Sequence, residues 1–128
     1  MKSDIPKVLH GILGKPIVRH VIDSLKGAGF TDIITVAGYG SDLLKEEAKD
    51  TRVVIQKKLL GSADAVITAK SKIGKFSGDI LIICGDTPLI KANTINSLLE
   101  KHRSSKAGLT ILSARLQDPT GYGRMTAG

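Results

Sequence analysis

The sequence predicts an α/β domain with a mostly parallel sheet. Short runs rich in β-branched residues alternate with segments whose apolar residues recur at helical spacing, and glycines or Gly-Asp turns separate them. Such alternation is typical of βαβ units, in which helices cover both faces of a parallel sheet. A chain of 128 residues has room for one domain.

Four segments have the apolar spacing of helices. Gly14-Lys15-Pro16 is expected to open the first helix, with Pro16 at the first helical position, and Gly27 and Gly29 are expected to end it. Ser41 is expected to cap a short second helix that runs to Lys49 and turns Leu43 and Leu44 inward. Ser62 is expected to cap the third helix, whose buried stripe runs from Ala65 to Ile73, and the fourth spans Lys91–Arg103.

Four shorter runs are predicted to be strands: 32–37, 52–56, 79–84 and 109–115. The third of these, Asp-Ile-Leu-Ile-Ile-Cys, is the most apolar. Ligands of open α/β sheets bind at the carboxyl ends of the strands. The loops at 38–40, 56–62 and 85–86 are therefore expected to meet at one rim of the sheet.

No strand precedes the first predicted helix, although in a sheet built from crossover connections each helix normally follows a strand. We therefore expect residues 1–128 to be part of a larger domain, with a central strand missing before Met1. An open edge on the apolar run 79–84 would favour aggregation, self-association or borrowing of a strand.

The composition excludes several classes of protein. A single cysteine excludes an internal disulfide framework, and one Cys with three dispersed histidines does not make a zinc site. No stretch has the length of a membrane helix, and the N-terminus has no apolar core of a secretion signal. We expect a soluble, cytoplasmic protein.

The net charge of +7 would suit nucleic acid, but aromatic residues make up only 3% of the chain and the lysines are scattered. A small phosphorylated ligand explains the excess of cations equally well.

Seven motifs then appear in a fixed order. They are Met1-x-Ser3-x-x-Pro6-Lys7, Gly14-Lys15-Pro16, Gly38-Tyr39-Gly40, Gln56, Leu60-Gly61-Ser62, Gly85-Asp86-Thr87-Pro88-Leu89-Ile90 and Asp118-Pro-Thr-Gly-Tyr-Gly-Arg124. From Met1 to about Arg124 the chain closely resembles the uridylyltransferase domain of bacterial N-acetylglucosamine-1-phosphate uridylyltransferases. These are bifunctional enzymes that also carry a glucosamine-1-phosphate acetyltransferase.

The resemblance implies a Rossmann-like sheet of the nucleotide-diphospho-sugar transferase type, here lacking the upstream glycine-rich loop and the downstream sugar-binding part. It implies transfer of a uridylyl group from UTP to N-acetylglucosamine 1-phosphate, with Mg²⁺, in the cytoplasm, within a homo-oligomeric parent protein. The product, UDP-N-acetylglucosamine, is a precursor of peptidoglycan. We expect the parent protein to be active and these 128 residues alone to be severely impaired, since several phosphate-binding donors lie upstream.

The resemblance also implies roles for individual residues. Lys7 matches the lysine that contacts phosphate, and Asp86 matches the ligand of magnesium; both are candidate catalytic residues. Gln56, Gly61 and Ser62 match positions that bind the uracil, and an amide offers both a donor and an acceptor. The backbone of Cys84 and Gly85 would line the nucleotide, and Gly123 corresponds to a glycine beside the acetamido group of the sugar.

One departure is Asp64, which stands where the family has a histidine. An acid in the first turn of a helix is favoured by the helix dipole, but it also places negative charge near a phosphate site. Two alternatives stay open. One is a transferase for another base or sugar, such as a CTP- or molybdenum-cofactor-type enzyme, and the other is a non-catalytic, basic binding module.

Overall fold

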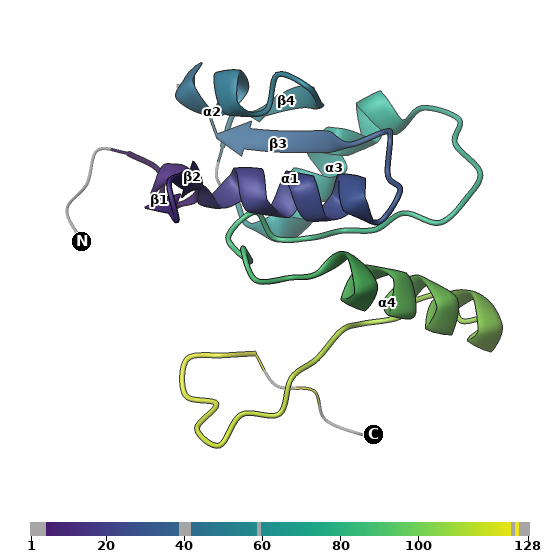
Figure 1. Cartoon of the computed structure of the whole chain (residues 1–128). Coiled ribbons are helices and arrows are strands. Elements are labelled where there is room, and N and C mark those ends of the chain that lie inside the picture. Colours follow the sequence, from purple (N-terminus) through teal and green to yellow (C-terminus); the bar gives the residue numbers. More distant parts are fainter. Residues whose placement is uncertain (1–4, 39–41, 59, 124, 126–128) are drawn as a thin grey trace.

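The computed structural model describes residues 5–38, 42–58, 60–123 and 125 (Figure 1). The 3₁₀ turn η1 (Lys7–Leu9) is followed by strands β1 (Gly11–Ile12) and β2 (Lys15–Pro16) and by helix α1 (Ile17–Gly27). Strand β3 (Ile34–Gly38), helix α2 (Asp42–Glu47) and strand β4 (Arg52–Gln56) come next. Helices α3 (Ser62–Ile73) and α4 (Ala92–Ser105) complete the order.

β3 and β4 form a parallel pair, in register from Ile34↔Arg52 to Gly38↔Gln56. This confirms the α/β class with parallel pairing that the sequence predicts. β4 has the predicted bounds, whereas β3 begins two residues later than expected, at Ile34. Both strands carry the β-branched residues that favour an extended backbone.

A small hairpin precedes α1 where the sequence indicated only a loop. β1 and β2 pair antiparallel, and both turn residues, Leu13 and Gly14, have positive φ, of 52° and 76°. Two such residues are what a two-residue turn of type I′ requires. Pro16 is therefore the extended residue before the helix, with ψ of 144°, and the expectation that it is the first helical residue is wrong.

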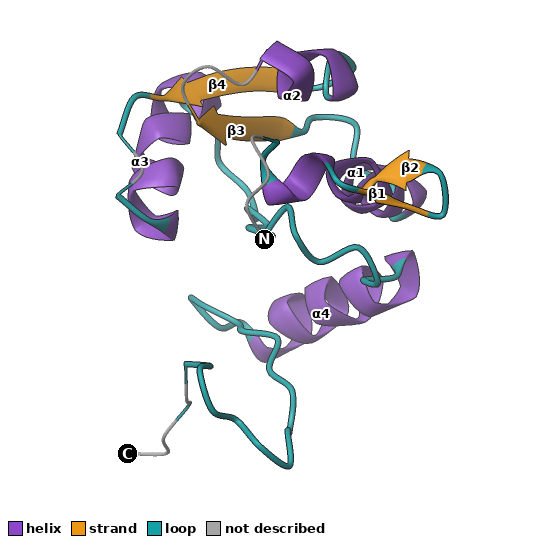
Figure 2. Cartoon of the chain, turned by 90° about the vertical axis from the view of Figure 1, so that its left-hand side faces the viewer, coloured by secondary structure: helices purple, strands orange, loops and turns teal. Residues whose placement is uncertain are grey.

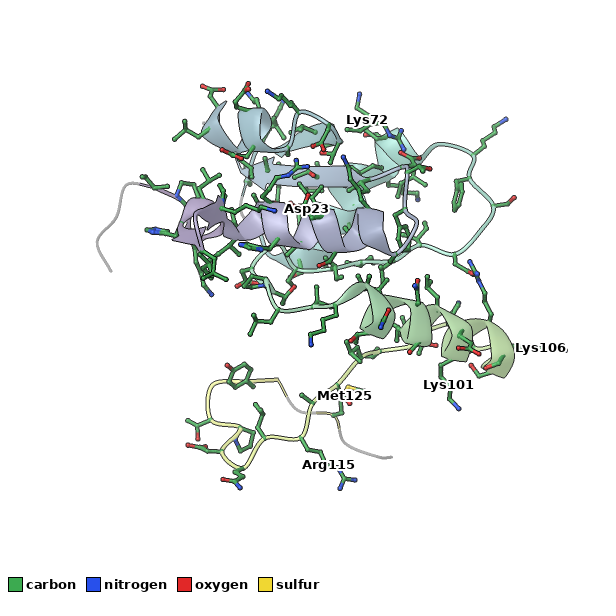
Figure 3. All side chains as sticks on the ribbon, in the orientation of Figure 1. Asp23, Lys72, Lys101, Lys106, Arg115 and Met125 are labelled. Atoms are coloured by element: carbon green, nitrogen blue, oxygen red, sulfur yellow. The ribbon has the colours of Figure 1, made fainter. Side chains whose placement is uncertain are left out.

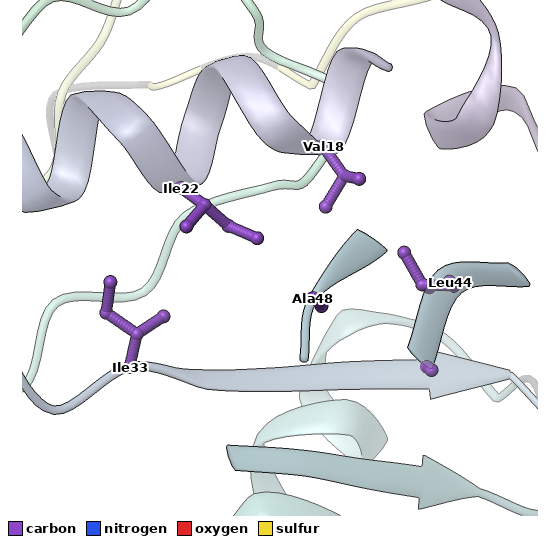
Figure 4. Packing of buried hydrophobic residues seen from close by; sticks show 6 residues of the cluster. Val18, Ile22, Ile33, Leu44 and Ala48 are labelled. Carbon is purple, nitrogen blue, oxygen red and sulfur yellow. The ribbon is translucent and has the colours of Figure 1, made fainter. Parts of the chain in front are cut away.

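The main core lies between α1, β3 and α2 (Figure 4). Its buried residues come from all three elements and their flanks: Val18, Ile22, Ile33, Ala37, Leu44 and Ala48. The helical spacing predicted this inward face of α1, since Val18, Val21 and Ile22 are all buried.

α2 shows how one residue step decides burial. Leu44 is 5% exposed and belongs to the core, whereas its neighbour Leu43 is 63% exposed. Adjacent helical residues point about 100° apart, so one narrow stripe cannot bury both. The expectation that Leu43 turns inward is wrong, and the expected cap Ser41 lies outside the described residues.

The predicted strands 79–84 and 109–115 are not strands in the structure. In the first segment burial still alternates, with Leu81 and Ile83 half-buried and Ile80 and Ile82 exposed. The segment is thus covered on one face in the manner of a strand. Within the described part of the chain, however, β3 finds a parallel neighbour only in β4, so these apolar runs form no ladder.

α4 begins at Ala92, after the N-cap Lys91, and buries Ile95. The figures show α4 beside the α1–β3–β4 unit, with the C-terminal segment continuing on the side away from the sheet (Figure 2). No helix in the described ranges is long and apolar enough to cross a membrane.

An ion-pair network ties α1 to the turn between α2 and β4. The guanidinium of Arg19 donates to both carboxylate oxygens of Asp50, at 2.6 and 2.7 Å, and to the carbonyl of Glu47 at 3.0 Å. Lys26 also donates to Asp50. The hydrogen bonds from Arg19, followed by those from Lys26, hold the pKa of Asp50 well below its usual range.

The core predicts a sharp contrast between two neighbouring leucines. Leu44→Ala should lower the free energy of unfolding by about 2–5 kcal/mol, because it removes buried methyl groups and leaves a cavity. The control Leu43→Ala, on the same helix, should change it by less than about 0.5 kcal/mol. Urea denaturation followed by circular dichroism measures both, and equal losses would contradict the packing of α2.

The network predicts a pH-dependent stability. Because the pKa of Asp50 is lower in the folded state, the carboxylate stabilises the fold above the ordinary aspartate pKa of about 3.9 and loses that effect as the pH falls through its depressed value. Asp50→Asn should therefore be less stable than the unmodified chain at pH 7, and the difference should shrink steadily below pH ~4.

The matched control is Glu46→Gln, which breaks an exposed pair with Lys49 and should have a much smaller effect. Thermal unfolding of the three proteins between pH 3 and 7 makes the comparison. A difference for Asp50→Asn that stays constant over this range would contradict the role of the network.

Candidate functional site

The carboxyl ends of β3 and β4 lie side by side, because Gly38 and Gln56 are register partners. Figure 1 shows that β3 ends at the same end of the molecule at which α1 begins. The loops that follow both strands therefore start from one rim, as the parallel topology predicts. Of the loop 38–40, Tyr39 and Gly40 lie outside the described residues.

Lys7 and Asp86 meet near this rim, although 79 positions separate them in the sequence. Lys7 Nζ donates to Asp86 Oδ2 at 3.0 Å. The neighbours of both residues pack together, since a Cβ at Gly85 would lie 3.6 Å from Val8 and 4.0 Å from Val18. η1 and the start of α1 thus bring the ammonium to the carboxylate.

Both charges stay open to solvent, with side chains 74% exposed at Lys7 and 41% at Asp86. An exposed ion pair of this kind contributes only about 0–1 kcal/mol to stability. The pair therefore contributes little to the stability of the fold, and both charged groups remain accessible to a ligand.

Two side-chain hydrogen bonds shape the loop that carries Asp86. Thr87 Oγ1 donates to the carbonyl of Cys84 at 2.7 Å, and Ser24 Oγ of α1 donates to the carbonyl of Ile90 at 2.8 Å. Cys84 is exposed and unpaired. The first bond closes the turn at residues 84–87, and the second fixes the end of the loop to α1.

Gln56 ends β4 and is the one buried polar residue among those described, at 6% exposure. Its Nε2 donates to Asp64 Oδ2 at 2.6 Å and, more weakly, to the carbonyl of Gly61 at 3.4 Å. Asp64 departs from the family pattern, and its bond to Gln56 is not predicted by the sequence. The available signal was an acid in the first turn of the helix that follows the Gln56 loop.

Gly61 has φ of +98°, a conformation that favours glycine, and it is the N-cap of α3. The turn at Gly61 folds α3 back beside the end of β4, which explains the contact between Gln56 and Asp64. Ser62 is the first helical residue and not the cap, so that expectation is wrong. Its side chain is exposed, and its hydroxyl makes no hydrogen bond to any described residue.

Gly123 directly follows a locally stabilised turn of the C-terminal segment. Asp118 Oδ1 accepts from the backbone N–H and the hydroxyl of Thr120 at 3.0 and 2.6 Å, and these bonds lower the pKa of Asp118. Both views place this segment beyond α4, away from the sheet. The described C-terminal segment thus does not reach the rim in either view, and Arg124 of the same motif lies outside the described residues.

The described site residues thus form two groups, Lys7 with Asp86 and Gln56 with Gly61 and Asp64, and no hydrogen bond or ion pair between described residues joins them. No three His, Cys, Asp or Glu side chains cluster as a metal centre within the described ranges. Asp86 nevertheless fits a magnesium ligand. Its Oδ1 has no partner among those residues, and Mg²⁺ in phosphate sites usually takes only one or two carboxylates.

Basic side chains are spread over the molecule. Lys72 projects from α3, Lys101 and Lys106 from α4 and its C-cap, and Arg115 from the C-terminal segment (Figure 3). Asp23, also labelled there, binds Lys15 and Arg19 at 2.7 and 3.2 Å.

Comparison with known proteins assigns the chain. The family model described as the MobA-like NTP transferase domain matches residues 1–126. The chain is 42% identical over 126 residues to the bifunctional protein GlmU of Halalkalibacterium halodurans, and 43% to that of Limosilactobacillus fermentum. The GlmU protein of Listeria monocytogenes is 42% identical.

Each alignment covers 98% of this chain and 28% of the relative. The chain thus spans little more than a quarter of the length of these curated relatives. The resemblance found in the sequence is confirmed: the chain belongs to the family of MobA-like NTP transferase domains.

Proposed function

We propose that the chain supplies nucleotide-binding residues to a nucleotidyltransferase that joins UTP and N-acetylglucosamine 1-phosphate. The observation that carries the proposal is the convergence of Lys7 and Asp86 near the carboxyl rim of a domain that belongs to an NTP transferase family. The identity of the base and the sugar comes from the motif resemblance. We propose further that the parent protein is cytoplasmic and homo-oligomeric.

In this reaction a phosphate oxygen of the sugar phosphate attacks the α-phosphorus of UTP. The bond from that phosphorus to the bridging oxygen breaks, and pyrophosphate leaves with the electron pair. Such a transfer needs positioning and charge neutralisation more than covalent help. A protein can supply both with a few well-placed cations and backbone donors.

Lys7 suits the neutralising role, because its ammonium is exposed and held beside the rim by η1. A compact cation is adequate for contact with phosphate. A magnesium ion, when bound, would neutralise phosphate charge, and Asp86 would supply one oxygen ligand to it. The backbone of Cys84 and Gly85 would line the nucleotide next to these two groups.

Gln56 and the turn at Gly61 suit the base. Gln56 is a buried amide at the end of a strand, and the uncommitted hydroxyl of Ser62 stands next to Gly61. Together they offer the directed polar groups that a nucleobase edge needs. The sugar role of Gly123 has only the motif in its support, because its turn lies away from the rim.

The proposal predicts that Lys7→Ala weakens binding of UTP by about tenfold or more, because a charge-assisted hydrogen bond to phosphate is lost. Asp86→Asn should reduce the extra affinity for UTP that Mg²⁺ confers. The rise in melting temperature with UTP, with and without Mg²⁺, measures both effects.

The control is Lys101→Ala, which removes another exposed lysine, from α4. Since the Lys7–Asp86 pair adds little stability, all three variants should fold. Equal affinity for UTP in Lys7→Ala and Lys101→Ala would contradict the role of Lys7.

The same assay separates the alternatives. The family model covers NTP transferases in general, so a response to CTP, GTP or ATP that exceeds the response to UTP would assign another base. Steeply salt-dependent binding of oligonucleotides, with no response to any nucleoside triphosphate, would favour a basic binding module.

A further inference from the structure

The amide of Gln56 is held in one orientation by its surroundings. Two oxygen atoms face its Nε2: Asp64 Oδ2 at 2.6 Å and the carbonyl oxygen of Gly61 at 3.4 Å. Both are acceptors. Rotation of the amide by 180° would point Oε1 at these two oxygens and lose both hydrogen bonds, at a position that is almost fully buried.

The carboxylate of Asp64 contributes most to this orientation, because its bond to Nε2 is much shorter than the bond to the Gly61 carbonyl. A carboxylate only accepts hydrogen bonds, so it distinguishes the two ends of the amide, whereas a side chain that can also donate does not. Asp64 lies in the first turn of α3, where the helix dipole favours a negative group. Its bond to Gln56 also gives the charge a local partner, apart from any phosphate.

We propose that Asp64 is a specificity-determining, positioning residue that fixes Gln56 so that the carbonyl oxygen Oε1 alone is presented to the nucleobase. This proposal rests on the proposed function. The sequence suggested that Gln56 offers the base both a donor and an acceptor. In the structure Nε2 already donates to Asp64 and Gly61, so only the acceptor Oε1 remains for the base. No described residue donates a hydrogen bond to Oε1.

A lone acceptor selects for a ring N–H. Uracil carries a hydrogen on N3, which can donate to Oε1. Cytosine carries a bare N3 at the same position, and two acceptors in a buried site repel each other. An unmatched buried polar group of this kind costs about 1–3 kcal/mol, so UTP should be favoured over CTP by about tenfold or more. Asp64 thus acts on the base through Gln56, without contact of its own.

The test compares the affinities of Mg·UTP and Mg·CTP for the unmodified chain, for Asp64→Asn and for Asp64→Ala. The asparagine keeps the shape but can donate as well as accept, so Gln56 can turn its Nε2 toward N3 of cytosine. The ratio of the two affinities should fall by about tenfold in both variants, chiefly through a gain for CTP. This ratio does not depend on the folded fraction, because both ligands bind the same folded protein.

The matched control is Asp42→Asn, which makes the same chemical change in the first turn of α2, where Asp42 is exposed. It should leave the ratio unchanged. An unchanged ratio in both Asp64 variants, with UTP still bound, would overturn the role of Asp64 and leave the proposed function standing.

A measurement without nucleotide separates the two proposals. The Nε2 protons of Gln56 give their own signals in a ¹⁵N-resolved NMR spectrum, and the bond to Asp64 should shift one of them downfield. This shift should disappear in Asp64→Ala, which has no acceptor at this position, and persist in Asp42→Asn. If the Nε2 proton shift depends on Asp64 as expected but no nucleoside triphosphate binds, the proposed function is wrong. The proposed selection of uracil is then wrong as well. If the shift is absent from the unmodified chain, the positioning by Asp64 is wrong whatever binds.

Discussion

The in-register parallel pairing of β3 with β4 is the constraint on which the candidate site depends. Because Gly38 opposes Gln56, both strands end together, and the loops that follow them start from one rim. A two-stranded sheet has little stability of its own. The pair is held by apolar packing of α1 and α2, through Val18, Ile22 and Leu44, and by the Arg19–Asp50 bridge. The packing of helices outside the sheet thus helps to fix where the rim lies.

Local patterns predicted the elements whose burial is set by neighbours close in sequence. The apolar stripe of α1 and the bounds of β4 both follow from such patterns. Segment 79–84 is a case in which such a local pattern does not predict the structure. Its alternating burial matches the sequence, yet it forms no strand, because a strand also needs a hydrogen-bonded partner and residue order says nothing about its presence. The same limit applies to Ser62, where the positive φ of Gly61 decides the start of α3.

The candidate site, too, is only partly predictable from local sequence patterns. No local pattern could have paired Lys7 with Asp86 across 79 positions; only the motifs of a known family indicated it. Gln56 and Asp64 are only eight residues apart, separated by a loop and the first turn of α3. Their hydrogen bond nevertheless depends on the backbone conformation of Gly61, which sets the direction of α3. The motif placed Gly123 near the sugar, whereas the described structure puts its turn beyond α4.

The two groups at the rim differ in how firmly they are held, and this difference suits their proposed tasks. Gln56 is buried and its amide is bonded twice, so little side-chain freedom remains to be lost when a base binds. Lys7 and Asp86 are exposed and bind each other weakly. A phosphate and a cation could replace that pair with contacts of the same charge type, at little cost in desolvation. Selective binding of a highly charged nucleotide requires both features. The fixed amide of Gln56 would recognise the base, and the Lys7–Asp86 pair would give way to contacts with phosphate and a cation.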